Sequence, residues 1–277
     1  MRARASALPA ALEAVRPLGD AHGRPLLTLI LVGAVGWSVL QVETGGALLR
    51  ANGLPVLLEV VRGLLRPDFS PEVLRATARA AWATVVYALA GMSLALALGL
   101  PLGALASGVL FGRRLRPAVV AATRALLAGL RAVHELVWAW LFVAALGLSP
   151  LAAVLALALP YAGVLGRIYA DLLADVAAEP IAALASAGAT RGQRLLWGHL
   201  PMAAPDMVAY SFYRFECALR SSAILGFVGL GGLGFQIQIA LADLRWGAVA
   251  TALLALIALI ALVEAWSGAV RRDLAAA

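Results

Sequence analysis

The sequence contains no lysine, a single cysteine and few acidic residues. All 22 basic residues are arginine, set against 15 acidic ones, and the formal net charge is +7. Without lysine there is no P-loop lysine to hold nucleotide phosphates, so the chain does not hydrolyse ATP through that motif. The single cysteine, Cys217, excludes a disulfide within the chain and a cysteine-rich metal site. The sequence also has no metal-ligand cluster and no Ser-His-Asp spacing signature.

Charged residues are scarce, whereas apolar residues are abundant. The charged fraction is 13% and the hydrophobic fraction is 63%, while soluble domains average roughly 25% and 45–50%. A soluble domain of 277 residues could not bury this much apolar surface in one core. A bilayer removes the difficulty because lipid surrounds the outer surface. The composition therefore predicts an all-α, polytopic membrane protein, with arginines that mark topology and contact lipid headgroups rather than nucleic acid.

Six apolar runs approach the length of membrane-spanning helices, about 20 residues each. The third run is the most polar, and Pro101 is expected to kink the second. More arginines fall between the spans on the side of the N-terminus, which predicts that the N- and C-termini are cytoplasmic. The predicted spans are residues 26–42, 81–107, 118–146, 151–173, 206–228 and 248–266.

The N-terminal quarter differs in character from the rest. Residues 1–75 are predicted to hold a basic tail, the first span and a periplasmic amphipathic segment within 47–70. Ser70 and Pro71 have the residue types of a helix N-cap and first helical position. Residues 76–277 are predicted to form the transmembrane core.

A polar loop separates the fourth and fifth spans. Residues 179–201 read EPIAALASAGATRGQRLLWGHLP, and the spacing of the apolar residues predicts two short helices with a break after Gly188. A compact pair of helices fits a groove on a partner protein. The alternative is an interfacial helix that lies on the membrane.

The spacing in this loop resembles the "EAA" loop of binding-protein-dependent ABC importer permeases. In that family E-A-A-x-x-x-G is followed by nine residues and then I-x-L-P. This sequence keeps Ala183, Gly188, Leu200 and Pro201 but has Ala182 where the family has glutamate. The resemblance implies that the loop, about residues 178–200, couples the chain to a cytoplasmic ATPase.

Two further segments are similar to the phosphonate-type (PhnE-like) permeases. Residues 131–138, RAVHELVW, resemble the signature R-x-x-H-E-L-V-W, and residues 213–234 match a later segment. The similarity covers about residues 76–266. It implies a type I ABC importer permease fold, a bacterial inner-membrane location and a homodimer. It also implies a pair of ATPase subunits that bind ATP and magnesium, with no cofactor or metal in this chain, and a periplasmic or lipid-anchored binding protein that delivers a phosphonate or related oxyanion.

Several predicted spans carry ionisable residues, which are costly at membrane depth and usually face a bundle interior or a water-filled path. Glu135 follows Arg131 by four residues, and Arg220 follows Glu216 by four, so each pair is expected on one helix face. Such pairs either brace helices or line an anion pathway, where the planar fork of arginine suits phosphonate oxygens. The predicted pathway or gate residues are Arg131, His134, Glu135, Arg214, Glu216 and Arg220.

Other interpretations of these residues remain open. His134 could be a hydrogen-bonded packing residue, and no second histidine completes an H-E-x-x-H zinc motif. A secondary transporter without an ATPase would show an inverted internal repeat, and an intramembrane enzyme would use His134 and Glu135 as acid–base groups. The glycine run at 229–234 fits G-x-G-x-x-G but follows a membrane span, so we interpret it as backbone freedom.

Overall fold

The computed structural model describes residues 23–41 and 53–276. Within these ranges the chain forms helices and no strand, which confirms the predicted all-α class. The chain separates into two compact units, residues 1–59 and 60–277. The functional boundary predicted after residue 75 stays a prediction, and most of the predicted basic tail lies outside the described residues.

The first unit contains α2 (Gly23–Gln41), which coincides with the predicted first span. Its apolar part, Pro25–Gln41, is shorter than the helices that qualify as candidate membrane spans, so its role as the first span stays a prediction. The last residue of the prediction, Val42, lies outside the described residues. The next helix, α3 (Gly53–Leu64), falls within the predicted amphipathic segment.

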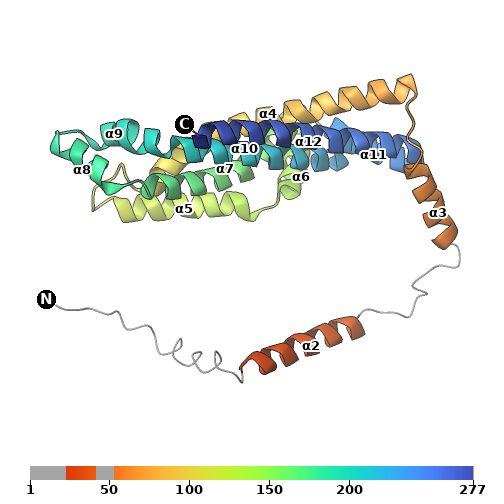
Figure 1. Cartoon of the computed structure of the whole chain (residues 1–277), viewed down its shortest axis with the longest axis horizontal. Coiled ribbons are helices and arrows are strands. Elements are labelled where there is room, and N and C mark those ends of the chain that lie inside the picture. Colours follow the sequence, from red (N-terminus) through yellow and green to blue (C-terminus); the bar gives the residue numbers. More distant parts are fainter. Residues whose placement is uncertain (1–22, 42–52, 277) are drawn as a thin grey trace. The chain divides into compact units, whose positions relative to one another are not determined.

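The second unit is a bundle of long helices (Figure 1). Helices α4 and α10 pack against each other and against both α7 and α12, α8 and α9 project at one end, and α11 lies at the other. The helices are α4 (Pro71–Ser107), α5 (Arg116–Ala132), α6 (Glu135–Leu146), α7 (Pro150–Ala174), α8 (Ala178–Ser186), α9 (Arg191–Arg194), η2 (Leu195–His199), α10 (Leu200–Leu225), η3 (Gly226–Val228), α11 (Gly232–Ala242) and α12 (Trp246–Ala276).

Three helices of the described chain, α4, α7 and α12, are long and apolar enough to cross a membrane singly. Two bent pairs, α5 with α6 and the segment Arg191–Val228 with α11, raise the number of candidate spans to five. The second, fourth and sixth predicted spans are thus continuous helices. Helix α4 continues through Pro101 to Ser107, and the kink expected there stays a prediction.

The third predicted span is wrong as a continuous helix. Val133 and His134 have extended backbone angles, and the axes of α5 and α6 differ by 86°. The His134 ring accepts the Leu136 amide at 3.3 Å, and the Trp138 indole donates to the Leu130 carbonyl at 3.3 Å. These side chains satisfy backbone groups that the break releases. No proline marks the break, so hydropathy did not predict it.

Small residues allow α4 and α7 to pack closely. A Cβ atom added at Gly91 or Gly103 would lie 2.8 Å from the Cβ of Leu157 or Tyr169, respectively. Close approach of helix backbones through glycine is the usual packing mode in membranes, where lipid gives no hydrophobic drive between helices. Helix α7 is accordingly buried along much of its length, and it forms the centre of the unit.

The glycine run after α10 forms a turn that uses the backbone freedom predicted for it. Gly229, Gly231 and Gly232 have φ values of 85°, 87° and 80°, a region that only glycine adopts readily. The turn is anchored to α4, because the Thr84 hydroxyl accepts the Leu233 amide at 2.9 Å. The Ser222 hydroxyl donates to the Thr84 carbonyl at 2.9 Å. This buried turn therefore joins α4, α10 and α11.

Replacing Gly232 by alanine should destabilise the bundle. The left-handed backbone disfavours a side chain by about 1–2 kcal/mol, and the new Cβ would lie 2.8 Å from the Thr84 hydroxyl oxygen. We expect a lower midpoint of thermal unfolding in detergent. Gly129→Ala is the matched control, because no atom lies within 4 Å of a Cβ there. Equal midpoints for the two variants would contradict the assigned role of the turn.

A polar clamp joins the residues before α4 to the start of α12. The Asp68 carboxylate accepts the Ser70 amide at 2.9 Å and lies 3.7 Å from the Arg245 guanidinium. The Asp68 amide donates to the Gly247 carbonyl at 3.0 Å, and the Thr251 hydroxyl donates to the Asp68 carbonyl at 2.7 Å. Hydrogen bonds from Ser70, together with the charge of Arg245, hold the pKa of Asp68 below its usual value of 3.8.

This lowered pKa predicts the pH dependence of the clamp. A depressed folded-state pKa means that the ionised Asp68 stabilises the fold above pH 3.8 and loses that effect as pH falls through the lower value. The unfolding midpoint of Asp68→Asn should therefore differ from wild type by a constant amount at neutral and mildly acidic pH. The difference should narrow only below pH 3.8. If the difference in unfolding midpoint between wild type and Asp68→Asn disappears between pH 8 and pH 5, a group other than Asp68 causes the pH dependence.

Candidate functional site

A polar cavity of 280 Å³ lies at the break between α5 and α6. Its other walls come from α7 and α10, and its α7 residues fall near the middle of that 25-residue helix. Four of the six predicted pathway residues, two arginines among them, meet here. The lining residues are Arg131, Ala132, Val133, His134, Glu135, Pro160, Tyr161, Val164 and Arg214.

Two tyrosines hold Arg214 at the cavity wall. The guanidinium lies 5.6 Å from the ring centre of Tyr161 and 5.8 Å from that of Tyr210. Its Nε atom donates to the Tyr210 hydroxyl at 3.2 Å. Contacts of this kind orient an arginine without neutralising it. Within the described chain no carboxylate pairs with Arg214, so its positive charge remains available to an anion.

Glu135 is the first residue of α6, directly after the break, and hydrogen bonds hold its carboxylate in place. Its Oε1 atom accepts the Ser221 hydroxyl at 2.7 Å, and the Ser221 oxygen lies 3.1 Å from the Tyr161 hydroxyl. Its Oε2 atom lies 3.7 Å from Nε2 of His134. Because Nδ1 of His134 accepts a backbone amide, the hydrogen of a neutral ring is on Nε2 and faces Glu135.

The predicted pairing of Arg131 with Glu135 is wrong. The helix breaks between these residues, so their four-residue spacing no longer places them on one face. Arg131 is exposed, and no carboxylate within the described ranges lies in ion-pair distance of it. The cavity lining thus contains two arginines and a histidine but only one carboxylate, that of Glu135, which already accepts a hydrogen bond. The N-terminus of α6 adds partial positive charge.

The predicted pairing of Glu216 with Arg220 is also wrong. Glu216 is 8% exposed and accepts a hydrogen bond of 2.7 Å from Arg271 of α12. Arg271 donates a second bond of 2.8 Å to Ser267. This geometry favours the bracing interpretation for Glu216. Arg220 is exposed and lies 3.8 Å from the sulfur of Cys217, so its pathway role stays a prediction.

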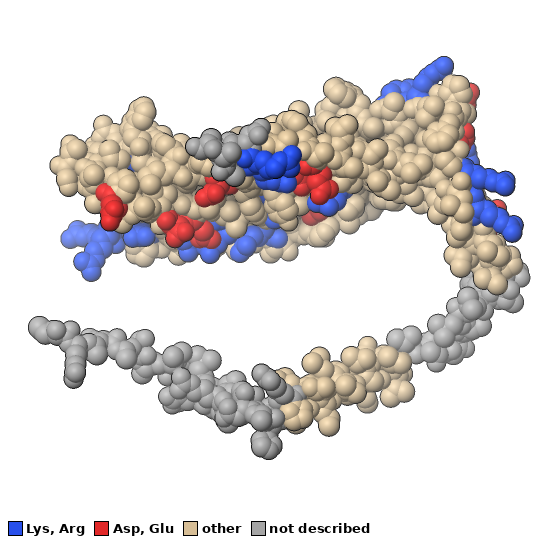
Figure 2. Space-filling model, in the orientation of Figure 1, with Lys and Arg blue, Asp and Glu red and all other residues tan. Residues whose placement is uncertain are grey.

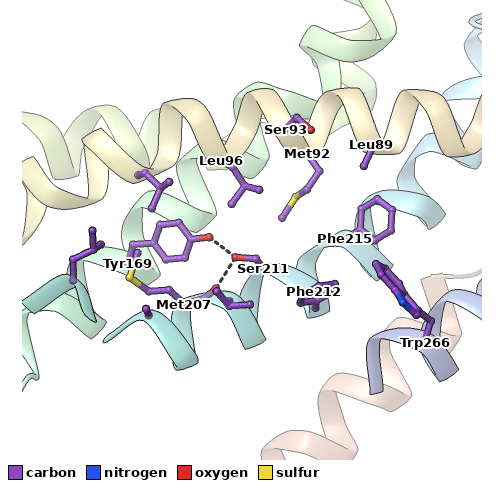
Figure 3. A pocket seen from close by; sticks show the side chains of 14 residues that line it. Leu89, Met92, Ser93, Leu96, Tyr169, Met207, Ser211, Phe212, Phe215 and Trp266 are labelled. Carbon is purple, nitrogen blue, oxygen red and sulfur yellow. Dashed lines mark hydrogen bonds between the residues drawn. The ribbon is translucent and has the colours of Figure 1, made fainter. Parts of the chain in front are cut away.

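A larger cavity of 550 Å³ lies between α4, α7, α10 and α12 (Figure 3). Its walls are mainly leucine, methionine, phenylalanine and tryptophan side chains, and none of these described lining residues is charged. The Tyr169 hydroxyl bonds to the Ser211 hydroxyl, which donates to the Met207 carbonyl. An oxyanion would lose its hydration there without gaining a partner, so the smaller polar cavity is the candidate site.

The loop between α7 and α10 forms two short helical segments, as predicted. Helix α8 ends before Gly188, whose φ of 83° turns the chain. Thr190 and Gln193 then form a capping box: the Thr190 amide donates to the Gln193 side chain at 2.8 Å, and the Gln193 amide donates to the Thr190 hydroxyl at 3.3 Å. Such a box fixes where a helix begins. The predicted motif residues Ala182 and Ala183 are exposed on α8.

The second half of the loop is tied to the bundle. The five residues of η2 form a π-helix that continues directly into α10 at Leu200 and Pro201. Gly198 packs beneath α8, since a Cβ there would lie 2.6 Å from the side chain of Ile181. His199 donates to the Leu173 carbonyl at the end of α7 at 2.8 Å. Helix α8 is therefore connected through η2 to the end of α7 and to the start of α10.

Sequence reasoning missed four residues that complete these arrangements. Tyr161, Ser221 and Arg271 come from elements distant in sequence from their partners, and no spacing pattern indicates them. Tyr210 precedes Arg214 by four residues on one helix, so that contact was accessible from the sequence.

The comparisons with known proteins agree with this architecture. The chain belongs to the family of binding-protein-dependent transport system inner membrane components, which matches residues 99–275. Over 221 residues it is 35% identical to the phosphite transport system permease protein PtxC of Stutzerimonas stutzeri, covering 80% of this chain and 78% of that relative. It is 38% identical over 191 residues to the phosphate-import permease protein PhnE of Mycolicibacterium smegmatis, covering 69% of this chain but only 35% of that protein.

The solved structures support the fold. A chain of the MetNI methionine ABC transporter in an inward-facing conformation matches with a TM-score of 0.65 and 22% identity, covering 74% of this chain and 99% of that one. A chain of an amino acid ABC transporter matches with a TM-score of 0.62 and 15% identity, covering 73% and 95%. The protein therefore has the type I ABC importer permease fold and is a multi-pass membrane protein.

Proposed function

We propose that this chain is the membrane-spanning subunit of an ATP-driven importer for a phosphorus oxyanion, such as a phosphonate, phosphite or phosphate. The observation that carries the proposal is the electropositive cavity beside the helix break, where Arg131, His134 and Arg214 converge next to the middle of α7. The names of the relatives in Stutzerimonas stutzeri and Mycolicibacterium smegmatis, which refer to phosphite and phosphate, support the same class of cargo.

The chemistry of the cavity suits a cargo that must bind and then leave. Two guanidinium groups and a helix N-terminus attract the oxyanion, and the planar fork of arginine matches its oxygens. Glu135 lies close by and limits that attraction, because a site that binds too tightly would not release its cargo. The tyrosine contacts fix Arg214 in place before the anion arrives, which reduces the entropy lost on binding.

The remaining parts of the importer are other chains. Two copies of this chain would form the pathway, with a pair of cytoplasmic ATPase subunits that bind ATP and magnesium and a periplasmic or lipid-anchored binding protein that delivers the anion. The N- and C-termini would be cytoplasmic in a bacterial inner membrane. The mechanism is alternating access: closure of the ATPases moves α8, and the contacts of Gly198 and His199 pass that motion to α7 and α10.

The direct test is transport by the complete complex in vesicles. The chain, reconstituted with its ATPase and binding protein, should accumulate phosphite, methylphosphonate or phosphate only when ATP is present on the side of the coupling loop. Uptake that persists without the ATPase would instead indicate a secondary transporter. Turnover of substrate by the isolated chain would indicate an enzyme that uses His134 and Glu135.

The exposed side chain of Trp197 tests the partnership with the ATPase. It is 76% exposed on the loop and lines a 330 Å³ cleft with Leu184 and Gly188. Exposed tryptophans beside a cleft are frequent anchors of protein interfaces, where truncation costs about 2 kcal/mol or more. Trp197→Ala should therefore weaken the affinity for the ATPase roughly 30-fold, which is measured as loss of the ATPase on copurification. Trp82→Ala, on an exposed face of α4, should leave copurification unchanged.

A further inference from the structure

Three arginines stand together where α4 ends and α5 begins. Arg113, Arg114 and Arg116 are exposed, and in the described chain none of their side chains makes an ion pair with a carboxylate. The sequence explains why, since it has no aspartate or glutamate between Glu72 and Glu135. Asp171 of α7 lies near this region but pairs with Arg124 and Arg167. The cluster thus has no internal counter-charge.

Two of the three arginines line a cleft of 370 Å³ together with apolar side chains. Arg113 and Arg116 supply the charged groups of the lining, and Phe111, Pro117 and Val120 supply apolar side chains. Arg114 belongs to the same loop but does not line the cleft. A cavity that combines guanidinium groups with apolar side chains matches an anionic amphiphile better than it matches a free ion.

The cleft lies at the end of the bundle that carries the coupling loop. Helix α4 reaches this end after 37 residues, longer than the roughly 20 residues needed to cross the hydrocarbon core. Arg191, the first residue of α9, packs against Gly112, with Nη1 2.7 Å from where a Cβ of that glycine would lie. Figure 2 shows basic side chains gathered at this end of the molecule. The cleft therefore lies at the end of a helix that is longer than the hydrocarbon core is thick, and beside the first residue of α9.

We propose that this cleft binds the phosphate group of an anionic membrane lipid. Arg113 and Arg116 would hold the phosphate oxygens by charge-assisted hydrogen bonds, and Phe111 and Val120 would contact the glycerol and the first methylenes of the lipid. A lipid held there braces the loop against which Arg191 packs, so it stabilises the position of α9. The assignment of the lipid to the cytoplasmic leaflet rests on the proposed function, in which the coupling loop is cytoplasmic.

The test measures lipid binding by the full chain and does not depend on cargo. Wild-type protein in phosphatidylcholine nanodiscs should unfold at a higher temperature when phosphatidylglycerol is added, because a ligand that binds the native state stabilises it. Arg113→Gln and Arg116→Gln should each weaken phosphatidylglycerol retention by roughly five-fold. Arg114→Gln removes the same charge from outside the cleft and should change retention by less than about two-fold.

Three outcomes would overturn the proposal. The first is a wild-type unfolding temperature that does not respond to phosphatidylglycerol, which needs no variant to observe. The second is an equal loss of retention in all three variants, which would indicate diffuse attraction to an anionic surface. The third is full stabilisation by inorganic phosphate in phosphatidylcholine nanodiscs, which would assign the cleft to a free anion. Loss of transport with normal lipid retention would count against the proposed function alone.

Discussion

Arg271→Ala is expected to lower the stability of the protein by about 1–3 kcal/mol, because the buried Glu216 carboxylate loses its charged partner, although the partly exposed Arg271 side chain leaves the pair within reach of water. Glu216 would keep its charge within the bundle while losing its 2.7 Å hydrogen bond. Arg271 also binds Ser267, so the substitution loosens the contact of α12 with α10. The midpoint of thermal unfolding in detergent should fall accordingly.

Two further variants distinguish the loss of the Glu216–Arg271 ion pair from a general effect of removing charge near the C-terminal end of α12. Arg272→Ala removes an exposed neighbouring arginine and should leave the midpoint nearly unchanged. The double variant Glu216→Gln with Arg271→Ala removes the uncompensated carboxylate and should recover most of the lost stability. If the double variant is no more stable than Arg271→Ala alone, the pair does not act as we describe.

Arg214→Gln is expected to have the largest effect on transport. A hydrogen bond to a charged group contributes about 1.5–3 kcal/mol, which corresponds to a rise in the transport KM of roughly 10–100-fold. Arg214→Lys keeps the charge but loses the planar fork and the geometry of the bond to Tyr210. Its KM should therefore lie between those of wild type and Arg214→Gln.

The controls for this prediction use arginine elsewhere on the chain. Arg75→Gln removes the same charge from an exposed position in the first turns of α4, away from the cavity, and should leave KM unchanged. Protein levels and unfolding midpoints of the variants must match, so that KM reports binding and not assembly. A wild-type KM for Arg214→Gln would show that the cavity does not hold the anion.

The two wrong pairings share one physical cause. Spacing of four residues places two side chains on one face only while the helix is unbroken, and it names no partner from another helix. Between Arg131 and Glu135 the chain is extended, so the pair separates. Glu216 and Arg220 do lie on one helix, but Arg271 reaches the Glu216 carboxylate from α12 and forms an ion pair with it at 2.7 Å. Neither the break nor the distant partner has a signal in local sequence.

The sequence alone determined the properties that depend on composition and local spacing. The apolar content required a membrane and helices, the absence of lysine excluded a P-loop, and Gly188 with Thr190 and Arg191 indicated the break between the two helical segments of the loop. Local patterns of this kind are read correctly because hydrogen bonds within a few residues enforce them. The motif spacing around Leu200 and Pro201 likewise indicated the family.

Only the tertiary structure decided which charges remain free. It brought Arg131, His134, Glu135 and Arg214 to one cavity, and it paired Glu216 with Arg271 of α12. Charge at membrane depth is costly unless it is paired or wet, so the partner of each ionisable group determines its role. That partner comes from another helix, whose position depends on packing at residues such as Gly91 and Gly163. Long-range packing, and not local spacing, therefore brings the residues of the polar cavity together.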